Sequence, residues 1–347
     1  MLIIGTSALV APASKIPLDA QNNGATLIEI NPTVSRITSN VDVHLPLTAS
    51  DELAQILKVL DTCAITTINI FLRSGTLSGA IIYKNGSYAY TGAKLMARVV
   101  ILGSAAAVND ANHDYTHFIL IGENDTPILV DAGSNPLGKI KNLGIDDESL
   151  QDVILTHFHP DHVAGIPNMM MHMWLLGRKA PMRIYGLHHC INRIEDIMEA
   201  YGWQEWPNFF PVSFHRISHR DDAPLLENND FRIRAFPVKH FVPTIGMRVE
   251  NKHNGKILGY GCDTEPCPGV RKIAQDVDVL IHEAAGDPPG HSTATHAGQI
   301  AAECNAKSLY LIHYQVWNQD PAPLVAEAEQ VYDGPVHLCK DFDEFEF

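Results

Sequence analysis

Hydrophobic runs bounded by turn-forming residues recur along the second part of the chain. Four of these runs have the length and the apolar content of buried strands, namely 97–104, 117–122, 127–133 and 152–157. The polar stretch between the second and third runs predicts a hairpin turn, and DDESL at 146–150 predicts a short capped helix. The pattern therefore predicts an α/β domain from residue 96 onward.

The first 60 residues show a different alternation of short apolar segments. Strands are predicted at 2–5, 25–32 and 42–47. A helix opening at Pro17 and a second helix over 51–60 are predicted between and after them. This order of elements is compatible with part of a nucleotide-binding α/β fold.

Residues 61–95 form a third region, which is rich in residues that favour strands. The segments 67–75, 79–84 and 87–92 alternate in polarity, and Asn85-Gly86 between the last two is a strong hairpin signal. We interpret 61–95 as a β-rich connector between the two flanking regions.

The bulk composition narrows the class of protein. Of 347 residues, 46% are hydrophobic and 19% charged, as in a globular protein with a core. No apolar run reaches the roughly 20 residues that a membrane helix needs, so membrane insertion is excluded. The start is apolar but has no Lys or Arg before Lys15, which favours a buried strand and turn over the alternative, a signal peptide.

The net charge and the cysteine content indicate which substrates and which cellular compartment to expect for this protein. The formal net charge is −15 and no dense Lys/Arg run occurs, so a long polyanion such as tRNA is disfavoured as a substrate. The six cysteines are scattered without paired spacing, which indicates reduced thiols and a cytoplasmic location.

Histidines are concentrated in the part of the chain that begins at the end of the strand predicted at 152–157. Fifteen of the 18 lie at or after His157, and the segment 156–162 reads THFHPDH. In an extended segment, His157 and His159 point to the same side and can bind one metal, whereas Asp161 and His162 lie at the next turn and can bind a second. Imidazole and carboxylate suit zinc, manganese or iron.

This segment resembles the metal motif of the metallo-β-lactamase superfamily, and its ribonuclease Z-like branch in particular. The resemblance covers residues 96–347 and includes RVVILGS, ILVDAGSN and VILTHFHPDHVAGIP. It implies an αβ/βα sandwich with two divalent metal ions, most simply zinc, that hydrolyses its substrate through a metal-bridged hydroxide. Asp161 would help to orient that hydroxide.

The resemblance also assigns the remaining ligands. It implies that His240 completes the first metal site, that Asp263 bridges both ions and that His313 binds the second ion; each could otherwise be a core histidine or a capping aspartate. Di-iron relatives that reduce oxygen carry Glu where His159 stands, so a hydrolytic zinc-type site is favoured. Asp131 either braces the metal loop or serves as a turn residue.

A second motif, HSTATH at 291–296, resembles the His-Ser-Thr motif of ribonuclease Z-like enzymes. The resemblance makes His291 the candidate general acid or phosphate contact, with an exposed histidine as the alternative. Ser292 and Thr293 are predicted to cap the following helix. Glu283 could orient a histidine, or end a strand in solvent.

The first 60 residues resemble the last part of a sirtuin NAD-binding domain through Gly5-Thr6-Ser7 and Glu29-Ile30-Asn31-Pro32. The resemblance implies NAD contacts at Ser7 and Asn31, in a partial Rossmann-like fragment over 1–60. The Gly-Ala-Gly phosphate loop and the zinc-binding cysteines of sirtuins are absent. NAD is therefore not the expected cofactor, and a fragment that only packs is preferred to an NAD-binding or sensing module.

The preferred function is hydrolysis of a small phosphodiester. The long basic arm of tRNA-processing relatives is missing between His162 and His240, so a small-molecule substrate fits better than tRNA. A lactonase or arylsulfatase-like esterase on the same site, or a scaffold without activity, are alternatives. Assembly into a homodimer stays open.

Overall fold

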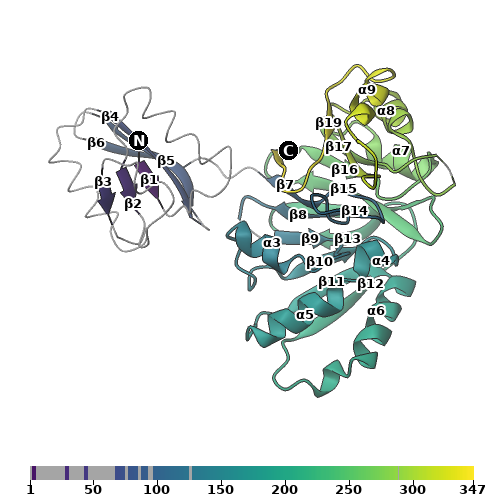
Figure 1. The fold of residues 1–347 in the computed structure, drawn as a ribbon, viewed down its shortest axis with the longest axis horizontal. Helices are drawn as coiled ribbons and strands as arrows, with labels where there is room; N and C mark the ends of the chain where they lie inside the picture. The colour runs from purple at the N-terminus through teal and green to yellow at the C-terminus, as the bar shows by residue number, and fades with distance from the viewer. Residues whose placement is uncertain are drawn as a thin grey trace. The chain divides into compact units, whose positions relative to one another are not determined.

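The chain divides into two compact units, residues 1–95 and 96–347 (Figure 1). The computed structural model describes residues 97–124, 127–287 and 289–347 in full, and the backbone of six strands before them. Those six strands are β1 (Leu2–Ile4), β2 (Ile28–Ile30), β3 (Val43–Leu45), β4 (Thr67–Ser74), β5 (Leu77–Lys84) and β6 (Ser87–Gly92).

The first unit contains two small sheets. Strands β1, β2 and β3 are parallel, whereas β4, β5 and β6 are antiparallel. Lys84 pairs with Ser87, as the predicted hairpin requires. Ser7, Asn31 and the helices expected near Pro17 and over 51–60 lie outside the described residues, so the sirtuin-like fragment stays a prediction.

The second unit is built on two mixed sheets of seven strands each. The first has the order β12-β11-β10-β9-β8-β7-β20 and the second the order β13-β14-β15-β16-β17-β18-β19. The strands of the first sheet are β7 (Arg98–Gly103), β8 (His117–Ile121), β9 (Pro127–Val130), β10 (Asp152–Leu155), β11 (Met182–Leu187), β12 (Val212–Ile217) and β20 (Glu344–Glu346). The strands of the second are β13 (Ala223–Glu227), β14 (Phe231–Val238), β15 (Thr244–Asn251), β16 (Ile257–Tyr260), β17 (Val279–Ala284), β18 (Leu309–Tyr314) and β19 (Val336–Leu338).

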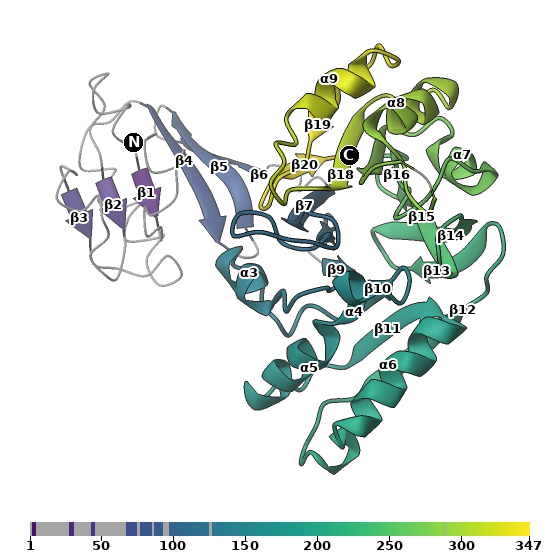
Figure 2. The same ribbon diagram turned by 45° about the vertical axis from the view of Figure 1, so that its right-hand side comes forward.

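Helices cover the outer face of each sheet, as Figures 1 and 2 show. Helix α6 packs on β11 and β12, whereas α7, α8 and α9 pack on strands of the second sheet. The helices are α3 (Leu137–Asn142), α4 (Pro160–Val163), α5 (Ile166–Leu175), α6 (His188–Ala200), α7 (Pro268–Ala274), α8 (Ala294–Glu303) and α9 (Pro323–Glu329), with a 3-10 turn η2 (Trp203–Glu205). The described helices contain none long and apolar enough to cross a membrane.

The four central residues of strand β7, 99–102, are all apolar because both faces of the strand are buried here. Val99 and Ile101 belong to the cluster that also contains Phe231 and Met247 of the second sheet, so they face the space between the sheets. Val100 and Leu102 belong to a separate cluster together with residues of α5 and α6. Successive side chains on a strand point to opposite faces, and here both faces are buried. The layers are therefore helix, sheet, sheet and helix, the αβ/βα arrangement.

Two local predictions have clear outcomes. The helix predicted at 146–150 is wrong: Asp146 accepts a hydrogen bond from the backbone N–H of Ser149 in a turn, and the helix in this region is α3. The sequence of 201–211, YGWQEWPNFFP, is compatible with a pocket wall or lid, or with a packed loop, and in the structure this segment packs. Its side chains Trp203, Trp206 and Phe209 lie against the core beneath the first sheet.

His117 of β8 gives a test of folding energetics. Burial, reinforced by the nearby charge of Lys139, lowers the pKa of this fully buried ring to about 4, while its Nδ1–H donates to the carbonyl of Tyr115 at 2.6 Å. An unfolded histidine takes up its proton near pH 6.5, before the folded one does. Stability therefore falls as the pH decreases from about 6.5 to 4, by up to about 3 kcal/mol from this group.

We predict that His117→Asn, whose amide can keep the bond to Tyr115, flattens this part of the stability curve. Urea unfolding of the metal-free protein at several pH values measures it, with His188→Asn at an exposed position as the control. An unchanged slope in His117→Asn would contradict the assignment.

Candidate metal centre

The loop after β10 presents the first four candidate ligands. His157 and His159 stand on extended chain directly after the strand, and His159 has φ −111° and ψ 153°. Pro160 then starts α4, since proline suits the first turn of a helix. Asp161 and His162 lie in that turn, so the change from extended to helical backbone separates the two pairs of side chains.

The second sheet supplies the other three. Strands β14, β16 and β18 run in one direction, because two antiparallel steps and two parallel steps separate them. Their carboxyl ends therefore meet at the same edge, where His240, Asp263 and His313 lie. His313 sits at a register shift between β17 and β18 and has φ 51°. A bulge of this kind redirects a side chain at the end of a strand.

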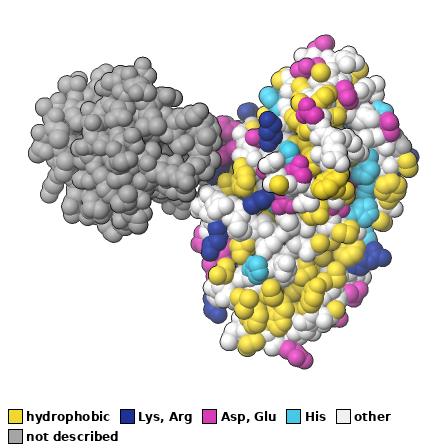
Figure 3. All heavy atoms as spheres, viewed as in Figure 1, with side chains coloured by type: hydrophobic (Ala, Val, Ile, Leu, Met, Phe, Trp, Pro, Cys, Tyr) yellow, Lys and Arg dark blue, Asp and Glu magenta, His cyan; other side chains and the backbone are white. Residues whose placement is uncertain are grey.

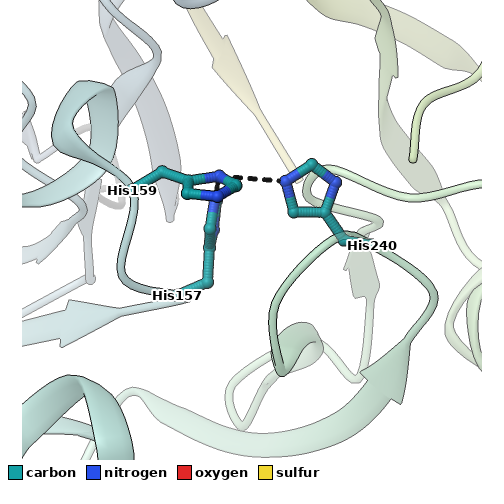
Figure 4. Close-up of side chains that lie close together, drawn as sticks. All are labelled: His157, His159 and His240. Carbon is teal, nitrogen blue, oxygen red and sulfur yellow. Dashed lines mark hydrogen bonds between the residues drawn. The ribbon is translucent and has the colours of Figure 1, made fainter. Parts of the chain in front are cut away.

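Three histidines form the first group, which Figure 4 shows. Nδ1 of His159 lies 3.0 Å from Nε2 of His157 and 3.0 Å from Nε2 of His240. His240 donates its Nδ1–H to the carbonyl of Gly290 at 2.7 Å, which leaves its Nε2 as an acceptor facing the other two rings. Burial, with the charge of His162, holds the pKa of His157 well below its usual value, which favours the neutral ring that a metal binds.

Asp263 joins this group to a second one. Its Oδ2 lies 3.3 Å from Nε2 of His313 and 3.4 Å from Nε2 of His162. The same oxygen lies 3.9 Å and 3.8 Å from Nε2 of His157 and His240. Asp161 faces the second group, with its Oδ2 3.5 Å from Nε2 of both His162 and His313. One carboxylate thus reaches both sets of ring nitrogens.

These residues fit two cations. The ligand atoms of His157, His159 and His240 lie within 4.8 Å of one another, as do those of Asp161, His162, Asp263 and His313. Nε2 of His162 is buried without a hydrogen-bond partner although it points at two carboxylates. All seven side chains predicted as ligands come together, in the two predicted groups. Nitrogen and carboxylate donors in these numbers suit zinc, manganese or iron.

The electrostatics of the second group favour positive charge. Burial alone would raise the pKa of Asp263, but the surrounding rings, His313 first, hold it well below its usual value. Burial alone would lower the pKa of His162, but Asp263 and Asp131 raise it well above its usual value. The two carboxylates therefore draw a cation, a proton or a metal ion, to this position.

Asp131 fixes the metal loop from beneath. It accepts hydrogen bonds from the backbone N–H and the hydroxyl of Thr156 at 2.8 and 2.7 Å, and from Nδ1 of His162 at 2.8 Å. The last bond leaves Nε2 of His162 as the ligand atom. Asp131 is fully buried and has φ 61°. Its three hydrogen bonds to Thr156 and His162 hold the metal loop, so it does more than form a turn. Cys262, unrecognised in the sequence, is also buried here, with Sγ 3.8 Å from Nδ1 of His157.

His291 and Glu283 form a pair beside the two groups. Glu283 is fully buried, so its predicted alternative, the end of a strand in solvent, is wrong. Nδ1 of His291 donates to Oε2 of Glu283 at 3.0 Å, and the ring stacks on His313 with 5.7 Å between centroids. Burial would lower the pKa of His291, but the hydrogen bond and the charge of Glu283 raise it.

The capping residues after His291 are only partly as predicted. Thr293 is the N-cap of α8, accepting a hydrogen bond from the N–H of His296 at 3.1 Å. Ser292 is not a cap, because its hydroxyl donates to the carbonyl of Thr264 at 2.6 Å. That bond ties the His291 segment to the loop that carries Asp263.

The centre opens into a pocket of about 620 Å³. Five ionisable side chains line its floor, and the rest of the lining is Gln315 and apolar side chains. The floor residues are His159, Asp161, Asp263, His291 and His313. The geometry therefore places a candidate two-metal centre at the bottom of a pocket large enough for a small molecule.

Comparison with known proteins agrees with this geometry. The family described as "Beta-lactamase superfamily domain" matches residues 126–314, more than half of the chain. Ribonuclease Z of Methanothermobacter thermautotrophicus is 26% identical over 297 residues, covering 68% of this chain and 92% of its own.

Two solved structures have the same fold. The metallo-beta-lactamase fold protein YhfI of Bacillus subtilis aligns with a TM-score of 0.61 and 24% identity, covering 73% of this chain and 100% of its own. The short form of human tRNase Z aligns with a TM-score of 0.59 and 24% identity, covering 72% of this chain and 98% of its own. At this identity the two structures show the fold alone.

We predict that Asp131→Asn weakens metal binding about 10- to 100-fold, because the carboxylate that orients His162 loses its charge. Titration of zinc against a chromophoric chelator measures the affinity. The control is Asp152→Asn, a buried aspartate at the other end of β10 that pairs with Arg183. Equal affinities in Asp131→Asn and the parent protein would show that this aspartate only shapes the turn.

Proposed function

The chain belongs to the beta-lactamase superfamily and is a metal-dependent hydrolase of ester or phosphodiester bonds, and we propose that its substrate is a small phosphodiester. One observation carries the proposal: two groups of metal-ligand side chains share Asp263 at the floor of a single pocket. Adjacent cations suit a phosphodiester, whose phosphoryl oxygens gain negative charge during hydrolysis.

Similarity to ribonuclease Z supports a phosphodiester over a lactone or a sulfate ester. A ribonuclease cleaves phosphodiester bonds, and the similarity extends over nearly the whole length of that relative. A lactonase or an arylsulfatase-like esterase would need the same cations, so these remain the alternatives on this site.

The surface supports a small substrate over a long nucleic acid. No Lys or Arg is among the residues that line the pocket. On the face drawn in Figure 3, Lys and Arg side chains of the second unit are scattered and form no continuous patch. A protein that binds a polyanion gains most of its affinity from such a patch.

The ligand assignment follows the two groups. His157, His159 and His240 would hold one ion, Asp161, His162 and His313 the other, and Asp263 both. Divalent cations at these positions supply Lewis acidity, which activates water near neutral pH and neutralises charge on the phosphoryl oxygens. Zinc is the proposed metal, because five of the seven donors are imidazoles.

His291 is proposed as the general acid. Glu283 occupies its Nδ1, so Nε2 is the atom left to reach a substrate in the pocket that His291 lines. The carboxylate of Glu283 favours a protonated ring, from which Nε2–H can donate to the departing oxygen. Asp161, which also lines the pocket, is proposed to orient the attacking water through its carboxylate.

We predict that zinc-loaded protein hydrolyses bis-p-nitrophenyl phosphate, that a chelator abolishes the activity, and that added zinc restores it. The same preparation is assayed against an aliphatic lactone and p-nitrophenyl sulfate. Turnover of the lactone or the sulfate without turnover of the diester would refute the phosphodiester assignment.

We predict that His291→Ala lowers kcat about 10²- to 10⁴-fold on a diester with an alkoxide leaving group, because a positioned acid contributes that much when the departing oxygen needs a proton. Metal content should stay that of the parent protein, since His291 is outside both ligand groups. His172→Ala, at an exposed position of α5, is the control. Parent-like kcat in His291→Ala would remove this residue from the mechanism.

A further inference from the structure

We infer that the mouth of the pocket binds a neutral planar ring on one ester arm of the substrate, such as an aryl group or a nucleobase. The inference rests on the proposed function and names its substrate class. The surface concerned is the apolar rim, which we define as Val108, Phe241 and Trp317. All three line the pocket above the metal centre.

Exposure singles out the rim. Val108, Phe241 and Trp317 are 57%, 61% and 60% exposed, among only seven strongly exposed large hydrophobic side chains in the described part of the chain. Leaving such groups in water is unfavourable, so their gathering at one pocket indicates a surface that an apolar ligand covers.

The chain connects the rim directly to the metal centre. Phe241 follows the ligand His240, and its ring lies 5.1 Å from that imidazole and 5.9 Å from His291. Trp317 stands four residues after His313. One ester arm can therefore connect a ring bound by these side chains to a phosphorus bound at the metal centre.

Phe241 is fixed in place although it is exposed. Its ring packs on Gly290, where an added Cβ would come within 2.4 to 2.9 Å of three ring carbons and where φ is +86°. The N–H of Gly290 donates to Glu265 at 2.9 Å, and its carbonyl accepts the hydrogen bond from His240. Gly290 thus contacts both the Phe241 ring and the metal ligand His240. Because the Phe241 ring is already held in place, it loses little conformational entropy when a substrate binds.

The loop that carries Trp317 is also held. Gln315 donates to the carbonyl of Ala285 at 2.6 Å, and Gln319 donates to Gln315 at 2.9 Å. Val316 between them is buried. The two glutamines therefore tie both sides of Trp317 to the end of β17, so the indole offers a positioned face for stacking.

Charge decides between a neutral ring and a charged group. The ionisable side chains that line the pocket all lie at its floor, and none is Lys or Arg, so a second anionic group would find no partner at the rim. Aromatic faces also attract quaternary ammonium groups. Two divalent ions below would repel such a group, so the neutral ring is the better fit.

The test keeps the leaving group constant and varies the other arm. Methyl, phenyl, thymidine-5′ and choline p-nitrophenyl phosphodiesters are assayed with zinc-loaded protein. We predict a kcat/KM for the phenyl and thymidine esters about 5- to 100-fold above that of the methyl ester, as expected for stacking on one or two aromatic side chains. The choline ester should not exceed the methyl ester; a preference for it would overturn the neutral-ring assignment.

Variants assign this preference to the rim. Phe241→Ala and Trp317→Ala should each remove most of this preference, whereas Phe241→Tyr and Trp317→Phe should retain it. Leu175→Ala, which removes an equally exposed side chain of α5, is the matched control. A preference that survives both alanine variants would contradict the inference.

Binding without turnover separates the inference from the proposed function. Calorimetric titration of zinc-loaded protein should show phenylphosphonate binding about 5-fold or more tightly than methylphosphonate, and Trp317→Ala should equalise them. If no diester is cleaved but this difference in affinity holds, the proposed phosphodiester substrate is wrong, whereas the proposed binding of a ring by the apolar rim is supported. Equal binding of the two phosphonates would overturn the rim even in an active enzyme.

Discussion

The structure depends on one carboxylate that faces four imidazole rings. Oδ2 of Asp263 lies between 3.3 and 3.9 Å from ring nitrogens of His157, His162, His240 and His313. Burying a charged carboxylate among polar rings is costly unless cations balance its charge and occupy the ring nitrogens. The rings come from both sheets, so the charge at this point also joins the two halves of the sandwich. Asp131 and Glu283, both fully buried, extend the network outward to the metal loop and to His291.

Site residues that are close together in the sequence can be predicted from local geometry, whereas residues that are far apart in the sequence cannot. The local motif at 157–162 is readable because strand geometry pairs His157 with His159, and a proline then turns the chain. His240, Asp263 and His313 were assigned by resemblance, and the shared direction of β14, β16 and β18 explains why they meet. Apolar runs such as β7 were readable because both of their faces are buried.

Other features leave no periodic signal. Phe241 and Trp317 resemble core aromatics in the sequence, and only the fold shows that both face the pocket. The role of Gly290 follows from a contact with a residue 49 positions away. The positive φ of Asp131, Cys262 and His313 is imposed by tertiary contacts against local preference. The helix predicted at 146–150 failed because Asp146 can cap a turn as well as a helix.

The central claim is that two metal ions lie side by side, with Asp263 bound to both. Anomalous scattering from a crystal of zinc-loaded protein, recorded at the zinc edge, tests it most directly. The account predicts two peaks per chain, one among His157, His159 and His240 and the other among Asp161, His162 and His313, with the Asp263 carboxylate between them. A single peak, or peaks away from Asp263, would contradict it.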